Sequence, residues 1–367
     1  MRIAIFSPSL ESGGAERVVV NLAQGFRRAQ HEVHLVLANA HGELLPEISP
    51  QIKIINLNKN RISDCILPLA RYIRSEKPDV FLSAQTHANI IASLSVLFSF
   101  HTTRLVLGEH TTVAIHLTPL YRNKGWLMLK LAKKLYPWAD VIVAVSKGAA
   151  QNIAQLLKIS EDKLHTIYNP VQIAEVERKA NDALAHPWFA PGEKPVLLAV
   201  GRLTAAKDYP TLLRAFSLVV EKKDVRLLIL GEGEERNELE KLIISLRLAK
   251  NVDLPGYVAN PYAYMSRASV FVLSSSWEGF AVVLVEALSC GATIVSTNCP
   301  SGPAEILENG RYGSLVPVGD APALAFAILE ALENKRDATL QRKRAQNFSE
   351  DRAISAYLTL FRSLLND

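Results

Sequence analysis

The sequence has 367 residues, 49% of them hydrophobic and 21% charged. Single cores rarely exceed about 250 residues, so this length predicts two domains with sizeable cores. The balance of 41 basic against 36 acidic residues is too even to indicate a nucleic-acid partner. The three cysteines have no paired spacing, which argues against a disulfide framework or a zinc site and is typical of reduced thiols in a cytoplasmic protein.

The first half alternates short apolar runs with amphipathic segments, which is the pattern of an α/β domain. The N-terminal run stops at Ser7 and Pro8, so we interpret it as a first strand and not as a signal peptide. The longest apolar stretch, Ala88–Phe100, is shorter than the roughly 20 residues that a membrane-spanning helix needs. The expected strands are Ile3–Phe6, Val33–Leu37, Lys53–Leu57, Val80–Ser83, Arg104–Gly108, Val141–Val145 and Leu164–Ile167.

The segment His186–Pro195 is rich in proline and predicts a linker, which gives one Rossmann-like domain over residues 1–188 and a second over 189–349. Two doubly wound domains bind ligands at the carboxyl ends of their strands, so we expect the site in the cleft between them. The expected strands of the second half are Val196–Val200, Arg226–Leu230, Val252–Leu254, Val270–Leu273, Thr293–Ser296 and Ser314–Val316. The expected helices are Tyr209–Val220, Glu235–Leu248, Val282–Leu288 and Ala321–Glu333.

Two glutamates stand out in SSSWEGFAVVLVEALSCG, because Glu278 precedes an apolar run and Glu286 lies inside it. A carboxylate in such a run needs partners, and sugar hydroxyls can donate hydrogen bonds to it. The loop that enters this helix suits a phosphate or a hydroxyl-rich ligand. The alternative is a helix-capping glutamate and a buried salt bridge. The amides beside Glu278 belong to Gly279, Phe280 and Ala281.

Two cations, Arg202 and Lys207, follow an apolar strand and Gly201. Paired cations in a loop before a helix predict a clamp for pyrophosphate, the alternative being a solvated loop. The sequence contains no D-x-D motif, so we expect this clamp to act without a metal ion.

Three further features lie at predicted strand ends. Gly13 and Gly14 permit close backbone approach to a ligand, or they only form a tight turn. His110 follows a strand, where it either touches a ligand or is structural. The segment GEGEER, Gly231–Arg236, lacks the third glycine of a dinucleotide fingerprint.

Taken in order, these motifs resemble the retaining GT-B glycosyltransferases of family 4, which carry an E-x7-E signature. GEHT at Gly108–Thr111, VSKG at Val145–Gly148 and YNPV at Tyr168–Val171 extend the resemblance over nearly the whole chain. The resemblance implies transfer of a hexose or N-acetylhexosamine from a nucleotide sugar to a glycan or lipid-linked acceptor in polysaccharide assembly. It also implies that the final helix, about 350–367, crosses back to the first, acceptor-binding domain.

The resemblance also implies roles for individual residues. Arg202 and Lys207 neutralise the departing diphosphate in a front-face displacement with retention, and Glu278 positions the donor. Glu286 accepts hydrogen bonds from ribose hydroxyls, and His110 touches the transferred sugar. The remaining expected donor contacts are Gly13, Gly14, Gly231, Gly233, Tyr257, Val258, Gly279, Phe280 and Ala281.

One segment departs from the family pattern. NCPSGPAEIL stands where many relatives carry two adjacent glycines, so the backbone that leads to Glu305 differs. Relatives with a CPSGP-like segment often use UDP-sugars in surface-glycan assembly, which favours UDP here.

A basic, aromatic stretch in the first half, centred on 119–138, predicts an interfacial helix that binds anionic lipid at the inner face of the membrane. Helical spacing places Lys130, Lys133 and Lys134 on one face and Leu131 elsewhere. The alternative is a helix packed on its own domain.

Other functions fit the sequence less well. A nucleotide-sugar epimerase or a non-catalytic sugar-nucleotide-binding relative shares the fold. A nicotinamide-dependent oxidoreductase needs a complete G-x-G-x-x-G, and an NTPase needs a G-x4-G-K-[ST] loop. Neither motif occurs in this sequence.

Overall fold

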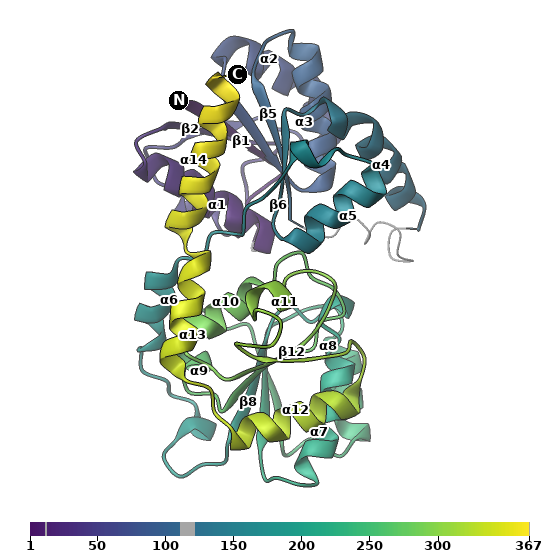
Figure 1. The fold of residues 1–367 in the computed structure, drawn as a ribbon, viewed down its shortest axis with the longest axis vertical. Helices are drawn as coiled ribbons and strands as arrows, with labels where there is room; N and C mark the ends of the chain where they lie inside the picture. Colours follow the sequence, from purple (N-terminus) through teal and green to yellow (C-terminus); the bar gives the residue numbers. More distant parts are fainter. Residues whose placement is uncertain (12, 111–121, 367) are drawn as a thin grey trace. The chain divides into compact units, whose positions relative to one another are not determined.

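The computed structural model describes residues 1–11, 13–110 and 122–366. Contacts divide the chain into unit 1, Met1–Pro170 with Glu350–Asp367, and unit 2, Val171–Ser349 (Figure 1). This boundary lies before the predicted linker, because helix α6 (Ile173–Ala180) already packs against helices of unit 2. The chain therefore enters and leaves unit 2 once, and its last helix belongs to unit 1.

Unit 1 contains a seven-stranded parallel sheet in the order β3-β2-β1-β4-β5-β6-β7. Its central strands are apolar runs buried on both faces, as helices on both sides of a sheet require. Register is set by pairs such as Ile3 with Val33 and Ile3 with Val80. The strands are β1 (Arg2–Ser7), β2 (Glu32–Leu37), β3 (Lys53–Asn56), β4 (Val80–Ala84), β5 (Arg104–Glu109), β6 (Val141–Ala144) and β7 (Leu164–Thr166).

Helices cover both faces of this sheet and form two apolar cores. Helices α1 and α14 pack together on one face, where Phe26 contacts Tyr357 and Phe361 (Figure 1). Helices α2, α3, α4 and α5 contribute to the core on the other face. The helices are α1 (Gly14–Arg28), α2 (Ile66–Glu76), α3 (Thr86–Ser99), α4 (Arg122–Leu135), α5 (Lys147–Leu157) and α14 (Glu350–Asn366).

Helix α4 corrects one expectation from the sequence. Leu131 is exposed, as Lys130 and Lys134 are, so it does not belong to the buried stripe of this helix. The helix is held against unit 1 by other residues, of which Ala132 and Leu135 are buried. Helical spacing alone did not show which stripe faces the core.

Unit 2 repeats the architecture with a six-stranded parallel sheet in the order β10-β9-β8-β11-β12-β13. The strands are β8 (Val196–Val200), β9 (Arg226–Leu230), β10 (Val252–Gly256), β11 (Val270–Leu273), β12 (Ile294–Thr297) and β13 (Ser314–Val316). The further helices are α7 (Tyr209–Val220), α8 (Arg236–Ser245), α9 (Tyr262–Met265), α10 (Val282–Ser289), α11 (Pro303–Ile306), α12 (Ala321–Glu333) and α13 (Ala338–Ala345). The prediction of two doubly wound, Rossmann-like α/β units is confirmed.

Candidate active site

The candidate site in unit 2 lies where the strand order of its sheet reverses. From β8 the chain proceeds outward through β9 to β10, and it then returns to β11 on the other side of β8. The loops after β8 and β11 therefore flank one crevice, which is where doubly wound sheets bind ligands. Lys207 lies in the first loop and Glu278 in the second.

Lys207 and Glu278 form an ion pair in this crevice. Lys207 Nζ lies 2.6 Å from Glu278 Oε1, and the side chains are only 18% and 14% exposed. Ser275 Oγ donates a hydrogen bond of 2.8 Å to the same carboxylate oxygen. The two charges are partly shielded from water, so their interaction is stronger than that of a surface pair.

Buried hydroxyl groups fix the two loops to each other. Ser274 Oγ donates to the Lys207 carbonyl oxygen at 2.7 Å, and the Ser276 amide donates to the Ala206 carbonyl oxygen at 2.8 Å. Thr297 Oγ1 donates to the Ser275 carbonyl oxygen at 2.6 Å. The run of serines after β11 thus sets the position from which Lys207 meets Glu278.

Arg202 is placed differently from Lys207. Its side chain is 79% exposed, and its Nε lies 4.0 Å from Glu234 Oε2. The structure brings Lys207 and Glu278 together, and leaves Arg202 as an exposed charge on the same loop. An exposed arginine retains the freedom to close on a bound anion.

The glycines of GEGEER allow two backbone segments to pack closely. A Cβ on Gly231 would lie 2.0 Å from the Gly201 carbonyl oxygen, and one on Gly233 would lie 2.3 Å from the Leu203 carbonyl oxygen. Leu203 also donates to the Glu232 carbonyl oxygen at 2.8 Å. These glycines therefore shape the loop that carries Arg202, whether or not they touch a ligand.

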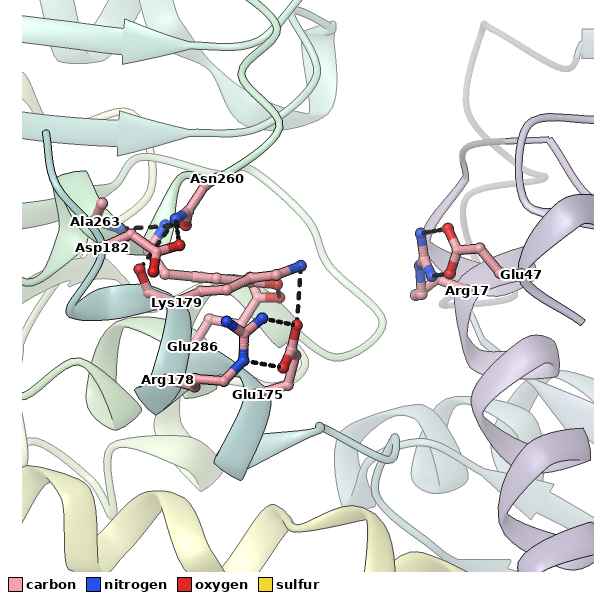
Figure 2. Close-up of polar contacts among 10 residues, drawn as sticks. Arg17, Glu47, Glu175, Arg178, Lys179, Asp182, Asn260, Ala263 and Glu286 are labelled. Carbon is pink, nitrogen blue, oxygen red and sulfur yellow. Dashed lines mark hydrogen bonds and ion pairs between the residues drawn. The ribbon is translucent and has the colours of Figure 1, made fainter. Parts of the chain in front are cut away.

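Glu286 has a protein partner, as its apolar surroundings require. Tyr262 Oη donates a hydrogen bond of 3.1 Å to Glu286 Oε1, which joins α9 to α10. Helix α6 also packs against α10, and Figure 2 shows its charged side chains in the same region as Glu286. Among them, hydrogen bonds from Arg178 and then Lys179 lower the pKa of Glu175 to about 2.

The loop that follows Glu278 is anchored by an aromatic contact. Phe280 is buried and its ring centroid lies 5.6 Å from that of Phe348. Gly302 packs against this loop, because a Cβ there would lie 3.1 Å from the Ala281 amide nitrogen. The segment that departs from the family pattern therefore supports the loop. Gly279 lies in the same loop and is partly exposed.

The expected contacts to the base lie at the end of β10. The side chain of Tyr257 is 77% exposed, and Val258 is half-buried. No described contact fixes the ring of Tyr257, so its role remains a prediction.

His110 is buried at the end of β5 in unit 1. Its Nδ1 lies 3.2 Å from Asn169 Oδ1. Burial lowers the pKa of His110 to about 4, and the Asn169 hydrogen bond opposes this only partly. The ring is therefore neutral at physiological pH, and with Nδ1 donating to Asn169 its Nε2 is an acceptor.

A second buried group precedes His110. The carboxyl group of Glu109 is fully buried, and its neighbours are Thr86 Oγ1 and Asn89 Nδ2, both at 3.1 Å, and the hydroxyl of Tyr136. Burial raises the pKa of Glu109 to about 7, although these hydrogen bonds lower it. The network ties the end of β5 to α3 and to the turn after α4.

Gly14 is the first residue of helix α1, and Gly13 is the residue that precedes it. A Cβ on Gly13 would lie 2.1 Å from Glu16 Oε2, so glycine is needed for the present position of that carboxylate. Gly14 has open space around it. Of these two glycines, only Gly13 has neighbours that explain why a side chain would not fit.

Sequence reasoning missed several partners of the predicted residues, among them Ser275, Tyr262 and Asn169. Ser275 lies in a serine run directly before Glu278, and Asn169 lies in the YNPV segment, so both stood in quoted motifs. Tyr262 carried no comparable signal. Within the described parts of the chain, no group of three or more metal-ligating side chains is arranged to hold an ion. Likewise, none of the described helices has the length and apolar character needed to cross a bilayer.

The sequence matches two family descriptions, "Glycosyltransferase Family 4" over residues 12–175 and "Glycosyl transferases group 1" over residues 181–350. A relative from Campylobacter jejuni is 33% identical over 366 residues, which cover 96% of this chain and 94% of the relative. The chain belongs to glycosyltransferase family 4. That relative is named N-acetylgalactosamine-N,N'-diacetylbacillosaminyl-diphospho-undecaprenol 4-alpha-N-acetylgalactosaminyltransferase.

Further relatives of this family 4 chain act in glycan assembly. LpsE of Rhizobium meliloti, a lipopolysaccharide core biosynthesis glycosyltransferase, is 27% identical and covers 96% of this chain and 97% of its own length. Among solved structures, Anabaena HepE in complex with UDP has a TM-score of 0.83 at 20% identity, covering 99% of this chain and 100% of that chain. These similarities confirm the GT-B fold of a glycosyltransferase.

Proposed function

We propose that this chain is a retaining glycosyltransferase that moves a hexose or N-acetylhexosamine from a UDP-sugar to a lipid-linked glycan. The observation that carries the proposal is the Lys207–Glu278 pair at the switch point of unit 2. The sugar and acceptor classes are supported by two C. jejuni relatives named as N-acetylgalactosaminyltransferases acting on undecaprenol-linked glycans. The choice of UDP is supported by HepE structures with UDP and with UDP-glucose.

In this proposal, cations compensate the charge that develops on the leaving diphosphate. Lys207 is held in place by Glu278 and the serine network, whereas exposed Arg202 closes onto the phosphates when the donor binds. Preorganised positive charge in a shielded site stabilises a departing anion strongly. Two such cations supply this charge without a metal ion.

The bond changes are those of a front-face displacement. The bond between the anomeric carbon and the phosphate oxygen breaks, and the acceptor oxygen bonds to the same face of that carbon. The acceptor proton passes to the departing phosphate oxygen. Glu278 accepts a hydrogen bond from a hexose hydroxyl and so positions the ring, and Glu286 accepts from the ribose. His110 Nε2 accepts from another hydroxyl of the transferred sugar.

Calorimetry of nucleotide binding tests the donor. We expect UDP to bind more tightly than GDP, ADP or NAD, with unchanged affinity in EDTA. Arg202→Ala/Lys207→Ala should lose UDP binding, while Lys241→Ala, an exposed lysine on α8, should retain it. Preference for NAD, or UDP affinity that survives the double substitution, would contradict the proposal.

Analysis of the reaction products tests whether a sugar is transferred and whether its anomeric configuration is retained. The chain is incubated with UDP-sugars and a polyprenyl-diphosphate-linked N-acetylgalactosamine acceptor, and NMR then assigns the new glycosidic bond. An α-linkage from an α-linked donor supports retention, and a β-linkage refutes it. An altered nucleotide sugar without transfer would instead indicate an epimerase, and donor binding without any turnover would indicate a non-catalytic relative.

We also propose that α4 holds the enzyme on an anionic membrane where lipid-linked acceptors lie. The predicted stretch 119–138 begins within 111–121, which lie outside the described residues. The described face of α4 and the following turn combines cations with exposed apolar side chains, and Trp126 is 55% exposed with Lys130 Nζ 3.9 Å from its ring centroid. The remaining members of this α4 face are Leu127, Leu131, Lys133, Lys134 and Trp138.

Liposome co-sedimentation tests the α4 face. Each lysine near an anionic surface contributes about 1 kcal/mol, so Lys130→Gln/Lys134→Gln should weaken binding to phosphatidylglycerol vesicles about 30-fold. Lys222→Gln/Lys250→Gln in unit 2 is the matched control and should bind normally. Equal binding to phosphatidylcholine and phosphatidylglycerol vesicles would refute membrane docking through this face.

A further inference from the structure

The sheet of unit 1 has its own topological switch point. Strand β1 is flanked by β2 and β4, and the chain moves outward from β1 on both sides. Helix α1, which follows β1, packs on one face of the sheet, and α3, which follows β4, packs on the other. The loops after β1 and β4 therefore flank a crevice of the kind that binds ligands in doubly wound sheets. The donor residues proposed above in unit 2 occupy the equivalent position of their own sheet.

Polar side chains from both flanking segments meet at this point. Gln85, directly after β4, donates from Nε2 to Glu16 Oε1 on α1 at a distance of 2.7 Å. His87, in the first turn of α3, is near enough to Glu16 for the carboxylate to influence its pKa. Burial lowers the pKa of His87 despite Glu16, so its imidazole is neutral at physiological pH. All three side chains are partly exposed, so a ligand can reach them.

The backbone adopts an unfavourable conformation at Gln85, the residue that joins β4 to α3. Gln85 has φ 82° and ψ 138°, a region that non-glycine residues rarely occupy. Its amide donates to the Gly108 carbonyl oxygen at 3.2 Å. Such strain costs about 1–3 kcal/mol and is concentrated at functional sites. A glycine at position 85 would be more stable, so the glutamine side chain itself is the useful feature.

The chemistry of the three groups selects a neutral, hydroxyl-rich ligand. A carboxylate accepts hydrogen bonds, a primary amide both donates and accepts, and a neutral imidazole has one donor and one acceptor nitrogen. A phosphate would be repelled by Glu16. The nearby cation Arg17 is already paired with the Glu47 carboxylate, as Figure 2 shows.

We infer that Glu16, Gln85 and His87 form the subsite for the terminal sugar ring of the acceptor, an inference that rests on the proposed transferase function. The amide of Gln85 and the carboxylate of Glu16 bind adjacent ring hydroxyls in a bidentate manner. His87 hydrogen-bonds a further hydroxyl or an N-acetyl group. These residues bind and orient the acceptor and do not take part in bond cleavage.

Substitution at position 85 separates binding from folding. Gln85→Gly removes the side chain and relieves the backbone, so the variant should melt no lower than the wild type. We expect its KM for a polyprenyl-diphosphate-linked N-acetylgalactosamine acceptor to rise at least 10-fold, with UDP affinity unchanged. Glu16→Gln should likewise raise the KM for this acceptor and leave the UDP affinity unchanged. Lys77→Gly, which replaces another residue of positive φ at the end of α2, is the matched control and should leave both constants unchanged. An unchanged acceptor KM in Gln85→Gly, or weakened UDP binding, overturns the assignment.

A direct binding measurement separates this inference from the transferase proposal. The full chain, with ¹⁵N-labelled glutamine and histidine side chains, is titrated with the octyl α-glycosides of N-acetylgalactosamine, N-acetylglucosamine, galactose and glucose, and separately with UDP. Shifts of the Gln85 amide and His87 ring signals with a glycoside, and not with UDP, support the subsite even if no transfer is detected. Absence of these shifts with all four glycosides overturns it. If UDP binding fails while the glycoside shifts persist, only the transferase proposal is refuted.

Discussion

Glu109 should make the stability of unit 1 depend on pH in a direction opposite to that of most carboxylates. Its buried carboxyl group has a pKa of about 7, whereas the ordinary value is 4.5. Between these values the folded chain keeps a proton that the unfolded chain releases. The stabilisation is therefore fully present below about pH 4.5 and is lost as pH rises through about 7.

The size of the effect follows from the two pKa values. The difference between 4.5 and about 7 corresponds to about 3 kcal/mol of unfolding free energy. Of this, about 2.5 kcal/mol falls between about pH 5 and about pH 8. Glu109→Gln cannot ionise, so it should show none of this dependence. Its amide replaces one acceptor by a donor, which adds a constant offset of about 1–3 kcal/mol.

Urea unfolding at both pH values measures the effect, with the tryptophans of unit 2 replaced by phenylalanine so that Trp126 and Trp138 report on unit 1. The quantity to compare is the free energy of unfolding of the wild type minus that of Glu109→Gln, because the contributions of the other titrating groups then cancel. We expect this difference to fall by about 2.5 kcal/mol from about pH 5 to about pH 8. A difference that does not change with pH would refute a protonated Glu109.

Three further predictions concern the glycines, the histidine and the tyrosine of the site. Gly231→Ala, whose Cβ would lie 2.0 Å from a backbone oxygen, should destabilise unit 2 by at least about 2 kcal/mol in urea. Gly14→Ala, with open space around it, should change the free energy of unfolding of unit 1 by less than about 0.5 kcal/mol. If both substitutions destabilised their units equally, the packing argument would be refuted. The NMR titration of His110 should give a pKa near 4, and Asn169→Asp should raise it by placing an anion beside Nδ1; an unshifted pKa would contradict the hydrogen bond. Tyr262→Phe removes one hydrogen bond of about 1 kcal/mol to Glu286, so it should weaken UDP binding about 5-fold in calorimetry. Unchanged UDP affinity would contradict the proposed contact between Glu286 and the ribose.

Much of the fold was predictable because parallel strands are continuous apolar runs. The strands Val196–Val200 and Val270–Leu273 and the helix Tyr209–Val220 were predicted with the bounds that the structure has. Apolar periodicity and caps such as Asp208, which accepts from the Thr211 amide, are local signals.

Contacts between distant loops were not predictable in the same way. Lys207 and Glu278 were each singled out, but they lie 71 residues apart in the chain, and their ion pair depends on the order of the strands that precede them. The positive φ of Gln85 was equally invisible, because no glycine or asparagine marks it. Propensity describes the favoured conformation, whereas this residue adopts an unfavoured one.

The path of the chain has a consequence for how this enzyme can be rearranged. Val171 and Ser349, the first and last residues of unit 2, pair in a parallel bridge and are therefore neighbours. Unit 2 is thus a continuous insertion whose two ends meet, the arrangement that best tolerates domain grafting. Exchange of residues 171–349 with those of a relative would change the unit that we propose binds the donor in one genetic step and leave unit 1, including α14 at its core, with its own sequence intact.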